Sequence, residues 1–125
     1  LVRGMCLMTA LQLSVVLGLG TGLIFAAEPL LGANWADVGY FCLALAPHVS
    51  AIFVAELSHG LYAFENGQRY LLTRQIMAGL SLSAAFVAAH LAGLDVYGAL
   101  LMAGLAHLAI QFAAFYLLGR RLAGS

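Results

Sequence analysis

The sequence contains no lysine, and only 8% of its 125 residues are charged. A soluble domain typically has about a quarter of its residues charged, because charge covers the surface that faces water. The scarcity of charge therefore favours a membrane as the main solvent. The formal net charge is zero, which excludes the basic surface that binds nucleic acid.

Cysteine residues are also scarce, and so are stretches in which apolar and polar residues alternate. The two cysteines are Cys6 and Cys42, and the topology derived below places them toward opposite faces of a bilayer. A disulfide needs Cα atoms within about 7 Å, so we expect none. No segment alternates apolar and polar residues over the length of a transmembrane strand, which argues against a barrel.

Long apolar runs dominate what is present. Four segments have close to the roughly 20 residues that a helix needs to cross about 30 Å of hydrocarbon. They predict an all-α integral membrane protein in which residues 1–125 form a single membrane domain. The expected transmembrane helices are 8–27, 38–61, 76–94 and 98–118.

The charged residues between these segments predict the topology. Arginine occurs before the first segment, between the second and third, and after the fourth, at Arg3, Arg69, Arg74, Arg120 and Arg121. In the other two connections every charged residue is acidic, namely Glu28, Asp37 and Asp95. Short connections favour an up-down antiparallel arrangement. The positive-inside rule then places both termini, and the hairpin that contains Glu65, on the cytoplasmic face of the inner membrane.

The chain begins with Leu1 rather than methionine, and we expect it to be a piece of a longer protein. A signal peptide is the alternative for the first segment. That segment is about twice as long as a signal-peptide core. The remaining helices of a longer transporter, or further copies in a homo-oligomer, are therefore expected partners beside the lipid bilayer.

Small residues and proline mark candidate packing or hinge positions. Gly18 and Gly22 lie four residues apart in the first segment and continue a stripe with Ser14 and Ala26. Such stripes let helix backbones approach closely, and clustered glycines also permit bending. Pro47 removes one backbone hydrogen bond from the second segment and predicts a kink there.

The second segment also carries ionisable residues. His48, Glu56 and His59 follow helical spacing and share a face with Ile52. Because an ionisable group in lipid costs several kcal/mol, about 3 on insertion scales, we expect this face to line the protein interior or a watery cavity. Glu56 is the foremost candidate for a proton site or a pathway charge; the alternative is a neutral carboxyl, or one paired with His59 or an arginine.

His107 and Gln111 lie four residues apart in the fourth segment and complete the pathway candidates. His48 and His107 are both expected near mid-membrane, where two histidines could ligate a haem or hydrogen-bond between helices. His48 and Glu56 are two turns, about 11 Å, apart along one helix, so we predict no metal site. No hydrolase or phosphate-loop pattern occurs, so we expect neither catalytic residues nor a cofactor.

Three segments together resemble a known family. They are "FAAEPLLG" (Phe25–Gly32), "LYAFENGQRYLL" (Leu61–Leu72) and "GLDVYGAL" (Gly93–Leu100). The chain resembles, from about residue 11 to 121, the C-terminal region of polysaccharide flippases in the superfamily that includes the MATE exporters.

The resemblance implies part of a transporter that moves lipid-linked oligosaccharide, a polysaccharide precursor, across the cytoplasmic membrane by alternating access. It assigns no catalytic residue. Two other hypotheses stay open from the residues alone. One is a stand-alone four-helix membrane protein with a structural or assembly role, and the other is a haem-binding electron carrier.

Overall fold

The computed structural model of the protein describes residues 2–62 and 67–124. The long helices are α1 (Val2–Leu31), α2 (Val38–His59), α3 (Gly67–Leu91) and α4 (Val96–Ala123). Single 3-10 turns, η1 (Ala33–Trp35) and η2 (Gly60–Tyr62), adjoin α2. The described residues contain no strand, and the four long helices are each long and apolar enough to span a membrane. The predicted all-α class is thereby confirmed, while Glu65 lies outside the described residues.

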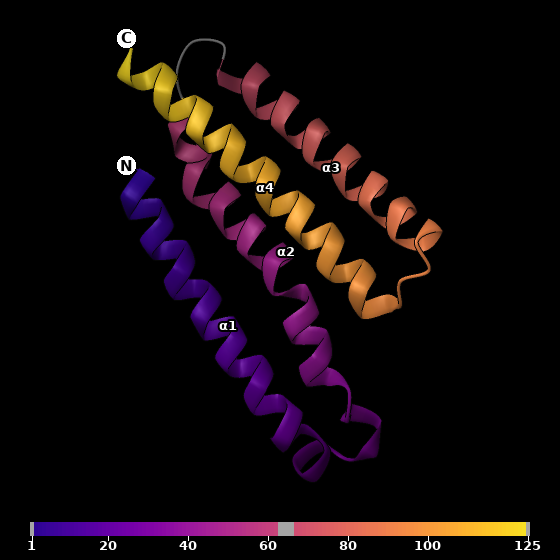
Figure 1. The fold of residues 1–125 in the computed structure, drawn as a ribbon. Coiled ribbons are helices and arrows are strands. Elements are labelled where there is room, and N and C mark those ends of the chain that lie inside the picture. The colour runs from indigo at the N-terminus through magenta and orange to yellow at the C-terminus, as the bar shows by residue number, and fades with distance from the viewer. Residues whose placement is uncertain (1, 63–66, 125) are drawn as a thin grey trace.

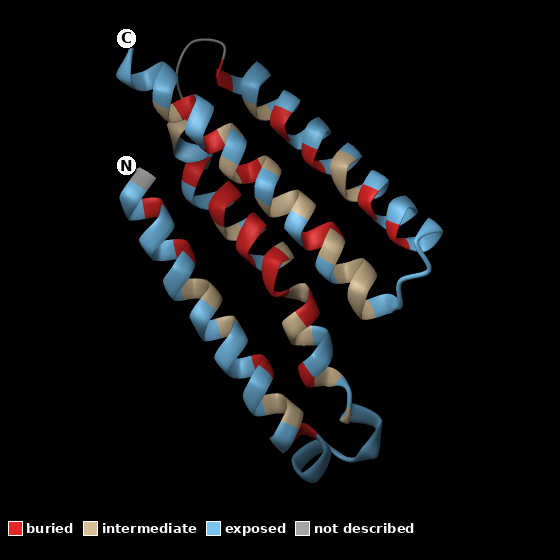
Figure 2. Cartoon of the chain, in the orientation of Figure 1, coloured by how far each residue is buried: buried red, intermediate tan, exposed pale blue. Residues whose placement is uncertain are grey.

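The helices form an open row in the order α1, α2, α4, α3. The extensive interfaces are between α2 and α4, α1 and α2, and α3 and α4. The start of α1, the end of α2 with η2, the start of α3 and the end of α4 lie at the same end of the molecule (Figure 1). Buried residues follow the inner sides of the row, and α1 and α3 expose most of their outer surface (Figure 2).

Several helices are longer than the apolar runs that predicted them. α1 includes Glu28 and Pro29, which were expected in a connection, and it ends before Gly32, whose φ of 96° is unfavourable for other residues. α3 begins at Gly67 rather than residue 76, so Arg69 and Arg74 are helical. Hydropathy finds only the part of a helix that matches the hydrocarbon, because polar end turns remain helical beyond it.

The connection between α3 and α4 is a tight turn. Gly93 has a φ of 71°, and the carboxylate of Asp95 accepts a hydrogen bond of 2.8 Å from the backbone nitrogen of Gly98. Asp95 is therefore the N-cap of α4, which satisfies one of the unpaired donors of its first turn.

Glycines allow neighbouring helices to approach closely. A Cβ at Gly104 would lie 2.9 Å from the backbone nitrogen of His48, and one at Gly20 would lie 2.8 Å from Cδ2 of Leu43. Gly18 and Gly22 have no heavy atom within 4 Å of a Cβ position. Among the described residues Gly18 and Gly22 therefore form no helix contact, because α1 turns its Gly20 face toward α2. Packing of the Gly18 and Gly22 stripe against a further helix stays a prediction.

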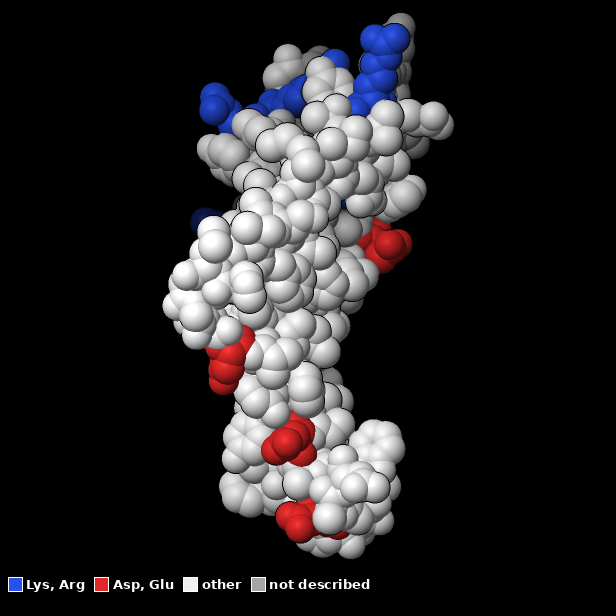
Figure 3. All heavy atoms as spheres, turned by 90° about the vertical axis from the view of Figure 1, so that its right-hand side faces the viewer, with Lys and Arg blue, Asp and Glu red and all other residues white. Residues whose placement is uncertain are grey.

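Charge is distributed unevenly along the row. Arginine side chains gather at the end that holds both termini, whereas acidic side chains lie along the remainder, mostly toward the opposite end (Figure 3). We call these the arginine end and the acidic end. This separation follows from the connections, since the arginines lie near the starts of α1 and α3 and the end of α4.

Candidate functional site

Two histidines from neighbouring helices meet at the middle of the row. His48 lies midway along α2 and His107 near the middle of α4. Their Nδ1 atoms are 3.1 Å apart, and their ring centroids are 4.9 Å apart at an interplanar angle of 47°. Gly104 makes this possible, because only a residue without a side chain lets α4 approach the backbone of α2 at His48 so closely.

Gln111 extends the pair along α4. Its Nε2 atom lies 3.1 Å from Nε2 of His107, and its side chain is buried. An amide nitrogen only donates, so with this amide orientation Nε2 of His107 accepts. His107 then carries its proton on Nδ1 and donates to Nδ1 of His48, which carries its own proton on Nε2. We call His48, His107 and Gln111 the histidine string.

The string borders a small cavity between α2, α3 and α4. His48 lines this cavity of about 130 Å³, with apolar neighbours that include Leu82 and Phe86. Since the other lining side chains are apolar, the imidazole is the group there that can hold or exchange a proton.

The direct ring contact does not fit the haem hypothesis. Haem ligation by two histidines places iron between the two ligating nitrogens and a porphyrin between the rings. Here the rings touch each other and share a hydrogen bond. The residues therefore match interhelical hydrogen bonding rather than an iron centre.

The face of α2 that was expected to line the protein interior or a watery cavity is divided. His48 is half-buried against α4, but Ile52, Glu56 and His59 are exposed on these four helices. α4 covers the face at the depth of His48 and leaves it open at Glu56 and His59. These two residues thus lie apart from the histidine string, and their place on a pathway stays a prediction.

A second polar contact joins α1 to α2. The hydroxyl of Ser50 lies 2.8 Å from Oε1 of Gln12 and 2.9 Å from the carbonyl oxygen of Ala46, and it can donate its single proton to either. Ser14 and Thr21 instead bond to carbonyls of their own helix. Ser50 is therefore the hydroxyl that links the first two helices.

The most unusual buried group is Arg74 of α3. Its side chain is only 5% exposed, and Nη1 donates to the hydroxyl of Ser58 at 2.8 Å. Its Cζ lies 5.0 Å from the ring centroid of Tyr62. Nε and Nη2 are buried and have no hydrogen-bond partner within the described part of the chain. A buried cation with two unused donors is costly unless an anion joins it.

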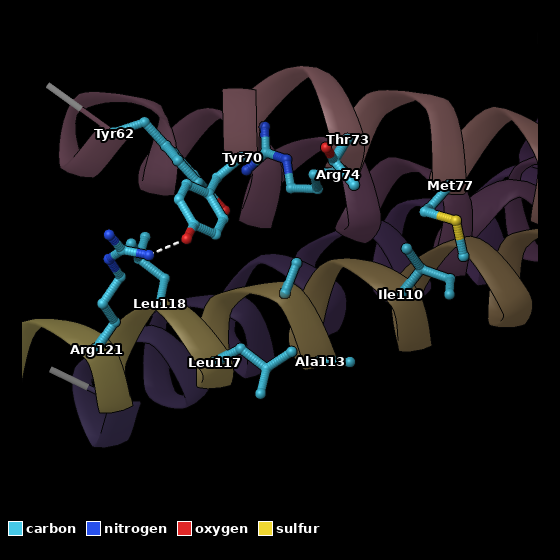
Figure 4. A pocket seen from close by; sticks show the side chains of 11 residues that line it. Tyr62, Tyr70, Thr73, Arg74, Met77, Ile110, Ala113, Leu117, Leu118 and Arg121 are labelled. Atoms are coloured by element: carbon cyan, nitrogen blue, oxygen red, sulfur yellow. Dashed lines mark hydrogen bonds between the residues drawn. The ribbon is translucent and has the colours of Figure 1, made fainter. Parts of the chain in front are cut away.

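Arg74 also lines a groove between α3 and α4. This α3–α4 groove, of about 290 Å³, is bordered at the arginine end by Tyr62, Tyr70 and Arg121, and deeper by apolar residues such as Met77 and Ile110. Figure 4 shows the aromatic and arginine side chains together at one end of the groove and Met77 and Ile110 toward the other. Arg121 donates from Nη1 to the Tyr70 hydroxyl, and its Cζ lies 4.4 Å from that ring's centroid.

Sequence reasoning placed Arg74 in a solvated hairpin and missed its burial. A signal for it exists in α3. The buried residues Gly67, Arg74, Ala78, Ala85 and Ala89 recur at spacings of seven, four, seven and four. This is the repeat of a helix–helix seam, and Arg74 falls on the same stripe as the small residues.

Comparison of the chain with protein-family models, curated proteins and solved structures finds no match.

Proposed function

We propose that this chain is part of a membrane transporter and that the histidine string lies on the pathway of its substrate or coupling ion. The four helices cross the inner membrane in an up-down antiparallel arrangement. The arginine end, with both termini, is cytoplasmic, as the positive-inside rule requires. Glu28, Asp37 and Asp95 then occupy the outer face.

The observation that carries the proposal is the hydrogen-bonded string itself. Polar and ionisable side chains at mid-membrane are costly, and where they occur they commonly mark ion or proton pathways. His107 has both ring nitrogens engaged, one with His48 and one with Gln111. Both hydrogen bonds can also run in the opposite direction, with His48 donating to His107 and His107 donating to Gln111. This needs the Gln111 amide to rotate by half a turn, so that its oxygen faces His107. Such a string can hold or pass a proton without losing its contacts.

The open row supports a larger assembly. Among the described residues, the extensive interface of α1 with a long helix is the one with α2. The apolar span of α1 has 29 residues, and only 11% of its most apolar window is buried. α3 likewise packs along α4. Further helices, or further copies of the chain, would cover these flanks and complete a cavity between helical lobes.

The proposed substrate class, lipid-linked oligosaccharide, depends on the resemblance of the three segments described above. The histidine string does not choose a substrate, and a proton-coupled exporter of amphipathic compounds would use the same polar centre. A purely structural four-helix protein is the contrasting outcome of the experiment below.

The test is transport in proteoliposomes that contain the full natural protein. A fluorescent polyprenyl-diphosphate sugar is incorporated in both leaflets, and its movement is followed by chemical quenching of the outer leaflet. We expect translocation above protein-free liposomes. His107→Gln keeps a hydrogen-bonding amide but removes the titratable ring, and we expect it to slow translocation by about tenfold, equivalent to about 1.4 kcal/mol.

His90→Gln is the matched control. It makes the same chemical change at an exposed position of α3, away from the string, and it should transport at the wild-type rate. Wild-type rates equal to protein-free liposomes would exclude this substrate class. Equal rates for both glutamine variants would remove the histidine string from the pathway.

A further inference from the structure

We propose that the α3–α4 groove binds one anionic phospholipid, with the lipid phosphate on the Nε and Nη2 edge of Arg74 and an acyl chain between α3 and α4. The inference rests on the proposed membrane insertion, but it does not require transport. The lipid is a bound partner at the arginine end and is separate from any substrate or ion that moves along the histidine string.

The guanidinium supplies the geometry. An arginine binds phosphate best through two parallel N–H groups on one edge of its planar fork. In Arg74, Nη1 is held by Ser58, and the edge formed by Nε and Nη2 is the one without a partner in the described residues. The Tyr62 ring, 5.0 Å from Cζ, supports the guanidinium from the side. Arg74 is thus held in place, and no described residue uses its two-donor edge.

Charge and access agree with an anion. Arg121 borders the same end of the groove and adds a second positive charge. Nε and Nη2 are shielded from solvent, so a phosphate needs one neighbouring side chain to rotate. Tyr70 lines the groove and is 46% exposed, so it is the side chain that would rotate toward solvent. Its hydroxyl is bonded by Arg121, and that donor would then turn to the phosphate.

The deeper groove suits a hydrocarbon chain. The lining on α4 runs from Ile110 to Arg121, a distance of about 16 Å along the helix. Ala113 and Ala114 leave the space open, and Leu117 and Met77 make its walls apolar. A free anion would gain nothing from these walls, whereas an acyl chain gains van der Waals contact with them.

The depths of Arg74 and of the apolar groove in the membrane match those of a lipid's phosphate and acyl chain. Arg74 directly precedes the apolar run of α3 that begins near Ile76, so it lies at the boundary between headgroups and hydrocarbon. The groove continues from there toward the acidic end. In a lipid of the leaflet at the arginine end, the phosphate therefore lies at the depth of Arg74, and the acyl chain lies at the depth of the apolar part of the α3–α4 groove.

The experiment measures lipid binding to the purified protein in detergent by native mass spectrometry, without transport substrate. The probes are phosphatidylglycerol and phosphatidylcholine with identical acyl chains. We expect one phosphatidylglycerol to bind at about tenfold lower concentration than phosphatidylcholine, because the choline cation offsets the charge of the same phosphate beside Arg74 and Arg121. Arg74→Gln should abolish the preference, and Arg74→Lys, which keeps the charge without the fork, should weaken the binding of both lipids.

Arg120→Gln is the matched control. Arg120 is exposed on the last turn of α4 and does not line the groove, so its loss should leave the preference intact. Ala113→Phe, at an exposed position of the groove wall, should weaken both lipids while leaving the melting temperature unchanged. Excess glycerol phosphate should not displace the lipid.

The opposite results overturn the proposal in separate ways. Full preference in Arg74→Gln would show that Arg74 does not hold the phosphate. Displacement by glycerol phosphate would show that the tail does not occupy the groove. Failed translocation with an intact lipid preference would count against the transporter proposal alone.

Discussion

The centre and the arginine end of the row each bury a polar group, and the two groups are treated differently. At the centre, both ring nitrogens of His107 have protein partners, and Oε1 of Gln111 is the one atom of the histidine string that is buried without a partner among the described residues. At the arginine end, only one of the three guanidinium nitrogens of Arg74 has one among the described residues. Both groups lie on helix–helix seams, so burial alone does not separate them.

The difference indicates different roles. A buried polar group whose bonds are made within the protein holds helices in register. A buried cation whose best binding edge is unused raises the energy of the lipid-free protein and is stabilised when an anion arrives. The comparison therefore predicts that the centre contributes to stability by itself, whereas the arginine end contributes through a ligand.

The largest effect is expected where α2 and α4 approach most closely. Gly104→Val puts a Cβ 2.9 Å from the backbone nitrogen of His48, and a backbone atom cannot move aside cheaply. We expect a loss of about 3 kcal/mol, at the upper end for overpacking, measured by unfolding in mixed micelles. Gly79→Val is the control, because a Cβ there meets nothing within 4 Å; equal losses for the two variants would refute the close approach at the string.

A smaller loss is expected when the string is cut without overpacking. His107→Leu removes both hydrogen bonds of the imidazole and leaves Gln111 buried without its partner. Membrane hydrogen bonds are individually modest, so two of them predict a loss of about 1–2 kcal/mol in the same unfolding assay. His90→Leu, at an exposed position, should change stability little, and a similar loss there would mean that the string stabilises nothing.

The smallest effect is expected at Arg74 in the absence of anionic lipid. Arg74→Met removes the Ser58 bond but also removes a buried, mostly unpaired charge, and such exchanges are often neutral or stabilising. We expect no loss of stability in lipid-free detergent. Phosphatidylglycerol should then stabilise the wild type, by about 2.7 kcal/mol at a hundred times its dissociation constant, but not the variant. A lipid-free loss larger than that of His107→Leu would reverse the comparison.

The apolar runs predicted the long helices, because about 20 consecutive apolar residues satisfy a length requirement that is local to each segment. They did not predict where the helices end, as the helical positions of Glu28 and Arg69 show. The contact between His48 and His107 was foreseen as one of two hypotheses, since both lie at mid-depth. The distance of two turns between His48 and Glu56 was foreseen, but the exposure of Glu56 on these four helices was not. Helical spacing predicts a shared face but not the length over which a neighbouring helix covers that face.

The sequence by itself determined that this protein is helical and has four segments fit to span a membrane, with arginine in alternate connections. These properties follow from local hydropathy, length and charge. Only the tertiary structure decided that Gly20 rather than Gly18 meets α2, that the histidines touch, and that Arg74 is buried with one edge unused. Those outcomes depend on how each helix is rotated against its neighbour, and the rotation is set by the packing of whole seams.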